Sequence, residues 1–207
     1  MLREYEKRFV PGTELRLSGD DKAPVLSGYI AVFNQLSDDL GGWREKILPG
    51  AFAETIKVHD IRALWNHEND KVLGRNKAGT LELVEDEVGL AFKNQPPDTT
   101  WFRDRVVSLK RKDVTGSSFG FYTDADEWGT ETDGTRVRSL SKVTLVEVSP
   151  GVTFPAYPQA STEMARRSMN AWLAAEAEKV RLAGQPSPDL VQMESRSRRL
   201  QLQRHGL

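Results

Sequence analysis

The chain has 207 residues, 38% of them hydrophobic and 29% charged, and its formal net charge is −1 at pH 7. A net charge this small provides no general attraction to nucleic acid or to an anionic membrane, and no apolar run approaches the roughly 18 residues that span a bilayer. The sequence contains no cysteine, which excludes disulfides, thiolate nucleophiles and cysteine-bound zinc and fits a reducing cytosol.

The N-terminal part of the chain is polar and of mixed charge up to about residue 24. Its opening, "MLREYEKRFVPG", carries charges where a signal peptide would need an apolar core. Within it, "REYEKRFV" is expected to form a short strand or an arm. Next, "GYIAVFN" (28–34) has apolar residues on both faces and predicts a central strand. A short helix is expected after the Pro-Gly pair of "LPGAFAETIKVHD" (48–60), and a strand in "IRALWNHE" (61–68).

The middle of the chain predicts a hairpin, a helix and more strands. In "GTLELVEDEVGLAFKNQ" (79–95), apolar residues alternate with charged ones on either side of a turn, which is typical of a hairpin. "TTWFRDRVVSLKRKDV" (99–114) is the clearest amphipathic helix, since its apolar residues recur at helical spacing. Strands are then expected in "SSFGFYTDADEW" (117–128) and, as one or two strands, in "RVRSLSKVTLVEVSP" (136–150).

A change in composition after Ala160 divides the chain. "STEMARRSMNAWLAAEAEKVRLAG" predicts a capped helix, which a Pro-rich break and a basic, polar tail follow. A chain of this length is expected to hold one core and an appendage. We therefore expect an N-terminal arm (1–24), one domain (25–160) and a C-terminal helical and basic tail (161–207).

The stretch "VTGSSFGF" (114–121) places two serines and two glycines inside an expected strand. Because side chains alternate along a strand, Phe119 and Phe121 share one face and anchor the strand in the core. Ser118 and Gly120 share the other face, where the glycine would leave open space for a peptide substrate in front of the hydroxyl. The alternative is a glycine that allows a bulge, beside a serine that faces solvent.

A serine nucleophile needs a base, and histidine, with a pKa of about 6.5, is the usual one. Of the three histidines, His205 lies in the tail and His59 lies at a junction between a helix and a strand. His67 follows an apolar strand and opens a polar loop, a position where catalytic groups are often held. A surface role for His67 is the alternative.

Glu147 is a candidate acceptor that would orient the histidine. In "SKVTLVEVSP" it is expected on the same strand face as Val143 and Leu145, where a carboxylate is costly unless it is paired. An imidazole N–H would serve as its partner. An arginine such as Arg138 would serve equally well, so both partners stay open.

Taken together, five segments resemble the prohead serine proteases of tailed bacteriophages, in the same order and with the same character. They are "GYIAVFN", "LPGAF", "ALWNHE", "GSSFGF" and "LVEVSPGVTFPAYPQA", and they span about residues 27–162. That family resembles the herpesvirus assemblin proteases. The resemblance implies an α+β fold, with a compact, mainly antiparallel β-barrel flanked by helices, and here the C-terminal helical tail is added.

The resemblance also assigns the site residues. The family's histidine falls on His67, its serine falls on Ser118 rather than Ser117, and the acidic residue of its "L-x-E-V-S" segment falls on Glu147. The family often carries a bulky apolar residue where Ser117 stands. For the oxyanion, backbone N–H groups near Gly116 or in the "RVRS" strand are candidate donors, and the arginine-bearing loop of the assemblin relatives suggests Arg136 or Arg138. No metal or organic cofactor is expected.

The implied function is a serine endopeptidase of prohead maturation. It would cut scaffold and capsid-protein segments, and also itself, inside the assembling procapsid in the host cytoplasm. Its partners would be the major capsid protein and its scaffold segment, with no nucleic acid or membrane, and self-association into a homo-oligomer stays open. The tail would tether the enzyme to scaffold or shell and then be removed by self-cleavage, or it would be a plain terminus.

Two other functions compete with the protease. The first is a non-enzymatic, capsid- or scaffold-associated barrel protein, and the second is a module that binds peptides at an open strand edge. Neither function requires a histidine, a serine and a carboxylate together. The joint presence of His67, Ser118 and Glu147 therefore favours the protease.

Overall fold

The computed structural model of the chain describes residues 4–10, 15–20, 23–153 and 163–183. The strands are β1 (Tyr5–Val10), β2 (Arg16–Ser18), β3 (Val25–Val32), β4 (Arg44–Ile47), β5 (Arg62–Trp65), β6 (Glu68–Arg75), β7 (Leu81–Glu85), β8 (Gly89–Asn94), β9 (Gly116–Thr130) and β10 (Arg136–Val152). The helices are α1 (Thr55–Val58), α2 (Thr100–Lys110) and α3 (Glu163–Ala183), and a 3-10 turn covers Asn76–Ala78. The α+β class is confirmed.

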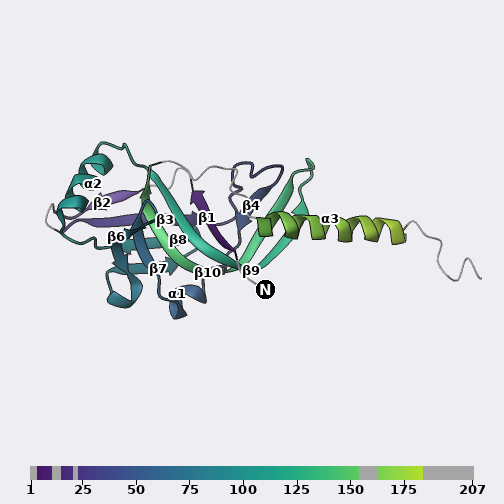
Figure 1. Cartoon of the computed structure of the whole chain (residues 1–207), viewed down its shortest axis with the longest axis horizontal. Helices are drawn as coiled ribbons and strands as arrows, with labels where there is room; N and C mark the ends of the chain where they lie inside the picture. The colour runs from purple at the N-terminus through teal and green to yellow at the C-terminus, as the bar shows by residue number, and fades with distance from the viewer. Residues whose placement is uncertain (1–3, 11–14, 21–22, 154–162, 184–207) are drawn as a thin grey trace, which may run out of the picture. The chain divides into compact units, whose positions relative to one another are not determined.

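The strands form two sheets, which Figure 1 shows with the long β9 and β10 strands crossing the molecule. One sheet has the order β1-β9-β10-β5-β6, with β4 also paired to β10, and the other has the order β2-β3-β8-β7. Pairing is mainly antiparallel, as expected, and β10 pairs in parallel with β4 and β5. Among the described strands the sheets do not close into the expected barrel, because each sheet ends in strands with a single hydrogen-bonded neighbour. The likeness to assemblin stays a prediction.

Most elements expected from local patterns are present. The "GYIAVFN" stretch lies in β3, between β2 and β8, so its central position is confirmed. The hairpin forms as β7 and β8, and the amphipathic helix forms as α2, which buries Phe102 and Leu109. The helix after the Pro-Gly pair is a single turn, α1. The N-terminal segment contributes β1, which pairs with β9 along its whole length.

One hydrophobic core joins the two sheets. Phe119 and Phe121 have no exposed surface and pack with residues of β3 and β8 such as Ile30 and Leu90. The alternation predicted for β9 is therefore confirmed on its apolar side. Because this side is committed to the core, the Ser118 side chain and the open face of Gly120 lie on the other side of the sheet, where the candidate site is built.

A β-bulge in β10 changes the direction of Glu147. Leu145 lies opposite Phe121, but Glu147 lies opposite Gly120, so two steps along β10 match one step along β9. A bulge of this kind reverses the side-chain alternation and re-aims the residues that follow it. The prediction that Glu147 shares a face with Val143 and Leu145 is therefore wrong, and its carboxylate lies on the face of Ser118.

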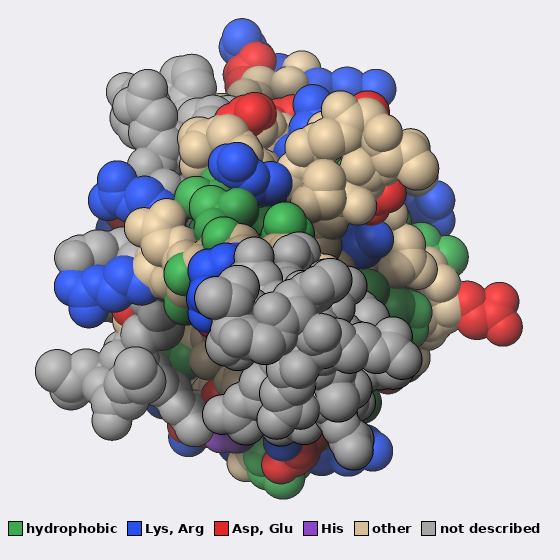
Figure 2. Space-filling view, turned by 90° about the vertical axis from the view of Figure 1, so that its right-hand side faces the viewer, with side chains coloured by type: hydrophobic (Ala, Val, Ile, Leu, Met, Phe, Trp, Pro, Cys, Tyr) green, Lys and Arg blue, Asp and Glu red, His purple; other side chains and the backbone are tan. Residues whose placement is uncertain are grey.

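The described residues up to Glu163 form one compact unit, and those from Met164 onward belong to a second. The second unit contains most of α3, which carries ion pairs between Lys179 and Glu176 and between Arg181 and Glu178. No described helix combines the length and the apolar character that a membrane crossing requires. Acidic and basic side chains both occur on the face shown in Figure 2, in keeping with the near-zero net charge.

Candidate active site

His67 lies in the tight turn that joins β5 to β6. Trp65 pairs with Glu68, so Asn66 and His67 are the two central residues of a hairpin loop. Both have positive φ angles, 51° and 61°, as a type I′ turn requires. Asn tolerates this conformation well and His less so, and strain of this kind often occurs at functional sites. The polar loop expected at His67 is thus a two-residue turn.

Contacts with β10 hold this turn in place. β5 runs parallel to β10, with Arg62 opposite Glu147. The backbone N–H of His67 donates to Ser149 Oγ at 3.0 Å. The ring of Trp65 lies over Gly151, where a Cβ atom would come within 2.7 Å of it. The imidazole is consequently fixed beside the residues that follow the bulge.

Glu147 is the partner of His67. Its Oε1 lies 2.5 Å from Nδ1 of His67 and also accepts a hydrogen bond from the Tyr5 hydroxyl at 3.0 Å. Its Oε2 accepts from Ser149 Oγ at 2.9 Å. Glu147 is buried. Of the two partners considered for its carboxylate, the structure shows the imidazole and not Arg138. Nε2 of His67 is also buried, and no described residue forms a hydrogen bond with it.

Ser118 lies next to this group, directly opposite Ser149 on the neighbouring strand. Opposed residues of an antiparallel pair point to the same face, with Cβ atoms about 4.5–5.5 Å apart. Ser118 has no exposed surface, and its hydroxyl donates to the backbone carbonyl of Arg8 at 2.9 Å rather than to His67. The serine and the imidazole therefore share one face, and Ser149, opposite Ser118, contacts His67.

Ser117 lies on the opposite face of β9, the face that carries Phe119 into the core. Its hydroxyl is buried, and no described residue forms a hydrogen bond with it. The side chains of Ser117 and His67 therefore lie on different sides of the sheet. Of the two adjacent serines, Ser118 is the one placed for chemistry with the histidine.

The prediction that Gly120 leaves open space in front of Ser118 is wrong. A Cβ atom at this position would overlap the Tyr5 hydroxyl and come within 2.6 Å of Glu147 Oε1. The glycine is needed because these two groups meet over its backbone. A substrate would have to reach Ser118 by another route, after movement of the side chains that bury it.

The arrangement has the parts of an acyl-transfer site. In such sites a carboxylate binds Nδ1–H of the histidine, which leaves Nε2 free to accept the proton of the nucleophile. Here Nδ1 faces Glu147 and Nε2 has no hydrogen-bonding partner among the described residues. The Ser118 hydroxyl is engaged with the Arg8 carbonyl, and catalytic hydrogen bonds are often absent before substrate binds.

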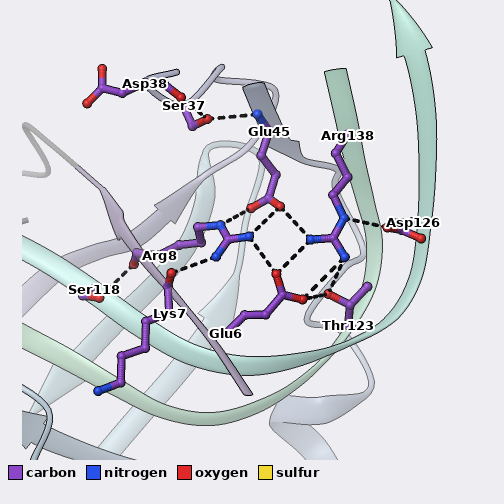
Figure 3. Close-up of polar contacts among 10 residues, drawn as sticks. All are labelled: Glu6, Lys7, Arg8, Ser37, Asp38, Glu45, Ser118, Thr123, Asp126 and Arg138. Atoms are coloured by element: carbon purple, nitrogen blue, oxygen red, sulfur yellow. Dashed lines mark hydrogen bonds and ion pairs between the residues drawn. The ribbon is translucent and has the colours of Figure 1, made fainter. Parts of the chain in front are cut away.

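The other face of β1 carries a buried network of charges, shown in Figure 3. It consists of Glu6 and Arg8 of β1, Glu45 of β4 and Arg138 of β10, all almost fully buried. Arg8 lies 2.7 Å from both carboxylates, and Arg138 lies 2.9 Å from Glu6 and 3.1 Å from Glu45. Two positive and two negative side chains thus tie three strands together behind the site.

The network shifts the pKa values of its members. Burial alone would raise the pKa of the Glu6 carboxyl, but the charges of Arg8 and Arg138, with hydrogen bonds from Arg138 and Thr123, outweigh it and lower the pKa below its ordinary value. Burial alone would lower the pKa of both arginines, but Glu45 and Glu6 raise it above the ordinary value. Glu6, Arg8 and Arg138 therefore retain their charges at neutral pH.

The two arginines proposed as oxyanion donors do not occupy the site. The guanidinium of Arg138 is fully engaged with Glu6, Glu45, Asp126 and Thr123. Arg136 is exposed at the start of β10, and the strand runs about 40 Å from there to Ser149, at roughly 3.3 Å per residue. The assignment of Arg138 is wrong because its guanidinium is already paired, and that of Arg136 is wrong because it lies too far along the strand.

Sequence reasoning did not identify Tyr5 and Ser149 as members of the site. Tyr5 is 142 residues from Glu147, and no local pattern connects the two. Ser149 lies two residues after Glu147, and this spacing on one strand was a signal that could have indicated it. The pairing of His67 with Glu147 could be predicted only because several segments together resemble one family.

We expect Arg138→Met to lower the free energy of unfolding by about 3–5 kcal/mol at pH 7, because it leaves buried carboxylates without a counter-charge. Since the pKa of Glu6 is lowered from 4.5 in the folded state, its stabilising contribution is present above about pH 4.5 and is lost as the pH falls through the folded value. The difference between Arg138→Met and the parent should therefore shrink in acid. Urea unfolding at pH 7 and pH 3 measures both effects.

Arg136→Met is the matched control, since Arg136 is exposed on the same strand. It should change the free energy of unfolding by no more than about 0.5 kcal/mol. Equal stability of Arg138→Met and the parent at pH 7, or a difference that stays constant in acid, would contradict this interpretation of the network.

Comparisons of the sequence with known proteins agree on one family. A sequence model described as caudovirus prohead serine protease matches residues 12–174. The prohead protease of Enterobacteria phage HK97 is 28% identical over 152 residues, which are 72% of this chain and 63% of the phage protein. The chain thus aligns with less than two thirds of that relative. Superposition on the solved structure of the bacteriophage T4 capsid assembly protease covers 72% of this chain and 99% of the T4 chain, with 9% sequence identity and a TM-score of 0.42. A TM-score this low supports no conclusion about the site.

Proposed function

Because the chain belongs to the caudovirus prohead serine protease family, we propose that it is a phage maturation endopeptidase that cuts peptide bonds by acyl transfer at Ser118. The observation that carries this proposal is the His67–Glu147 pair, to which Ser149, the residue directly opposite Ser118, is joined by a hydrogen bond. The assignment of Ser118, His67 and Glu147 as nucleophile, base and orienting carboxylate is part of the proposal.

In the proposed mechanism the Ser118 hydroxyl first leaves the Arg8 carbonyl and donates to Nε2 of His67. As Oγ attacks the scissile carbonyl carbon, the proton moves to Nε2, and Glu147 stabilises the imidazolium through Nδ1–H. The imidazolium then gives its proton to the leaving amine, and an acyl-serine remains. Water, deprotonated by His67, attacks this ester and releases the second product. Backbone N–H groups near Gly116 stay the candidate donors for the oxyanion.

The substrates proposed for this activity are the major capsid protein with its scaffold segment, and the chain itself. The activity would take place in the procapsid, inside the host cell. The arm (1–24), the domain (25–160) and the tail (161–207) remain the proposed division, with the tail as a tether to scaffold or shell. The part of the proposed tail beyond residue 183 lies outside the described residues. Self-association stays a prediction.

The competing functions receive less support from the site. A non-enzymatic capsid component or a peptide-binding module has no use for a buried carboxylate paired with an imidazole, because burial of such a pair is costly. It also has no use for a histidine held at a φ of 61° in a two-residue turn. Costs of this kind are typical of sites that perform chemistry.

Co-expression with the major capsid protein from the same genome tests the proposed function. Intact-mass and peptide analysis of both chains should show new termini in the capsid protein, and these should be absent when the capsid protein is expressed alone. An unchanged capsid protein in the presence of soluble, folded enzyme would favour the non-enzymatic alternative.

We expect Glu147→Gln to lower kcat by about 10³- to 10⁴-fold, because the amide no longer stabilises the imidazolium but still fills the same space. The protein should stay soluble. Glu68→Gln is the control, since Glu68 follows His67 and is exposed, and its kcat should match the parent. Loss of all soluble protein with Glu147→Gln would instead assign the carboxylate a structural role.

A further inference from the structure

The hydroxyl of Tyr5 meets the same carboxylate oxygen as the imidazole. It donates to Oε1 of Glu147 at 3.0 Å, and Nδ1 of His67 lies 2.5 Å from this oxygen. Building on the proposed protease function, we propose that Tyr5 is a positioning residue, which fixes Oε1 of Glu147 where His67 needs it. A residue of the N-terminal strand would thus take part in a site otherwise assembled from β5, β9 and β10.

The backbone around this contact is shaped to permit it. Tyr5 lies opposite Tyr122 on β9, and its hydroxyl extends along the sheet to the place above Gly120. Any side chain at position 120 would displace both the phenol and Glu147 Oε1. The ring of Tyr5 is held edge-on against Tyr122, with 5.7 Å between the ring centroids. The phenol therefore has a fixed approach to the carboxylate.

The phenol is suited to a constant donor role. Burial raises the pKa of Tyr5 above its usual value of 10, and the negative charge and hydrogen bond of Glu147 raise it further. Tyr5 consequently keeps its proton throughout the pH range in which a peptidase is assayed. Ser149 donates to Oε2, so each oxygen of the carboxylate accepts a hydrogen bond from a hydroxyl. The two hydroxyls and the imidazole together stabilise the negative charge of Glu147.

Removal of the phenol hydroxyl has two distinct consequences for His67. Oε1 becomes free to move, so the imidazole is less well oriented for proton transfer and kcat falls. The remaining charge on Glu147 is also less dispersed and stabilises the protonated imidazole more strongly. A higher pH is then needed to obtain the neutral base, so the acid limb of the rate profile moves to higher pH. Loss of structural support alone would not move this limb.

Other charged side chains lie on the elements around this pair. Arg62 of β5 lies opposite Glu147 and forms an ion pair with Asp60. The ammonium of Lys7 on β1 lies 5.8 Å from the centroid of the Tyr5 ring. On α2, the guanidinium of Arg105 lies 5.8 Å from the centroid of Trp65, two residues before His67. The exposed Glu68 follows His67 in the chain. None of these side chains changes when Tyr5 becomes Phe, so the shift can be ascribed to the phenol.

The test compares Tyr5→Phe with the parent in the full chain, with kcat and KM measured from pH 5 to pH 9 on a capsid-derived peptide. We expect kcat to fall about 10- to 100-fold with little change in KM. The acid limb of kcat/KM should move up by about 0.5–1 pH unit. Tyr29→Phe is the control, since Tyr29 also donates to a carboxylate, that of Asp86 at 2.8 Å, but in the other sheet. Its kinetics should match the parent.

A parent-like kcat in Tyr5→Phe would overturn the inference, as would a lower kcat with an unmoved acid limb. These outcomes leave the proposed function intact if the parent cuts the peptide and Ser118→Ala does not. Absence of cleavage by the parent, or cleavage that survives Ser118→Ala, would reject the proposed function and this inference with it. The experiment thus separates the two failures.

Discussion

Ser118→Ala is expected to remove peptidase activity, with a fall in kcat/KM of about 10⁴- to 10⁶-fold. The change deletes the attacking oxygen and creates almost no cavity. It also removes one hydrogen bond to the Arg8 carbonyl, worth about 1 kcal/mol of stability. The protein should therefore fold, and co-expressed capsid protein should stay uncut, as measured by mass spectrometry of both chains.

Ser117→Ala is the matched control for this experiment. Ser117 is the adjacent residue, is equally buried, and its hydroxyl points to the core side of β9. Its activity should match the parent. Continued cleavage by Ser118→Ala would place the nucleophile elsewhere, and Ser149 would then be the first residue to examine, since its Oγ lies 3.4 Å from Nδ1 of His67.

Replacement of His67 is expected to be as severe, with kcat lowered by about 10⁴-fold or more in His67→Ala. Without the imidazole, the site loses its proposed base, and a serine hydroxyl is a weak nucleophile at neutral pH. Ala is also disfavoured at the positive φ of 61° found there. His67→Asn is the sharper variant, because Asn accepts this conformation and cannot act as a base. Both variants should lose activity, and the melting temperature of His67→Asn should be at least as high as that of His67→Ala.

His59→Ala provides the comparison. Its Nδ1 lies 3.2 Å from Oγ1 of Thr55, the first residue of α1 and not one of the residues assigned to the site. It should retain parental activity. Full activity in either His67 variant, measured as kcat/KM on the same peptide, would reject the assignment of His67 as the base.

Local patterns in the sequence predicted most of the secondary structure. The hairpin of β7 and β8 and the helix α2 form where apolar periodicity placed them, because each buries one face against the common core. The closed barrel did not follow, since closure depends on pairing between distant strands. Position 147 was predicted on the wrong face because the bulge that turns it depends on how β10 aligns with β9, for which no residue near Glu147 gives a signal.

The candidate site was predictable only in part. The pairing of His67 with Glu147, 80 residues apart, could be proposed because serine, histidine and carboxylate occur in segments that resemble one family. The contribution of Tyr5 could not, since it depends on β1 lying beside β9. The role of Arg138 was likewise hidden, because two of its four partners, Glu6 and Glu45, come from strands far from it in the chain.

Reaction with a fluorophosphonate, followed by peptide mapping, examines the activated serine itself. One equivalent of adduct should form on the peptide that contains Ser118, and none should form in His67→Asn, because only a base beside that hydroxyl makes it reactive at neutral pH. An adduct on another serine, or equal labelling of Ser118 with and without His67, would contradict the proposed chemistry.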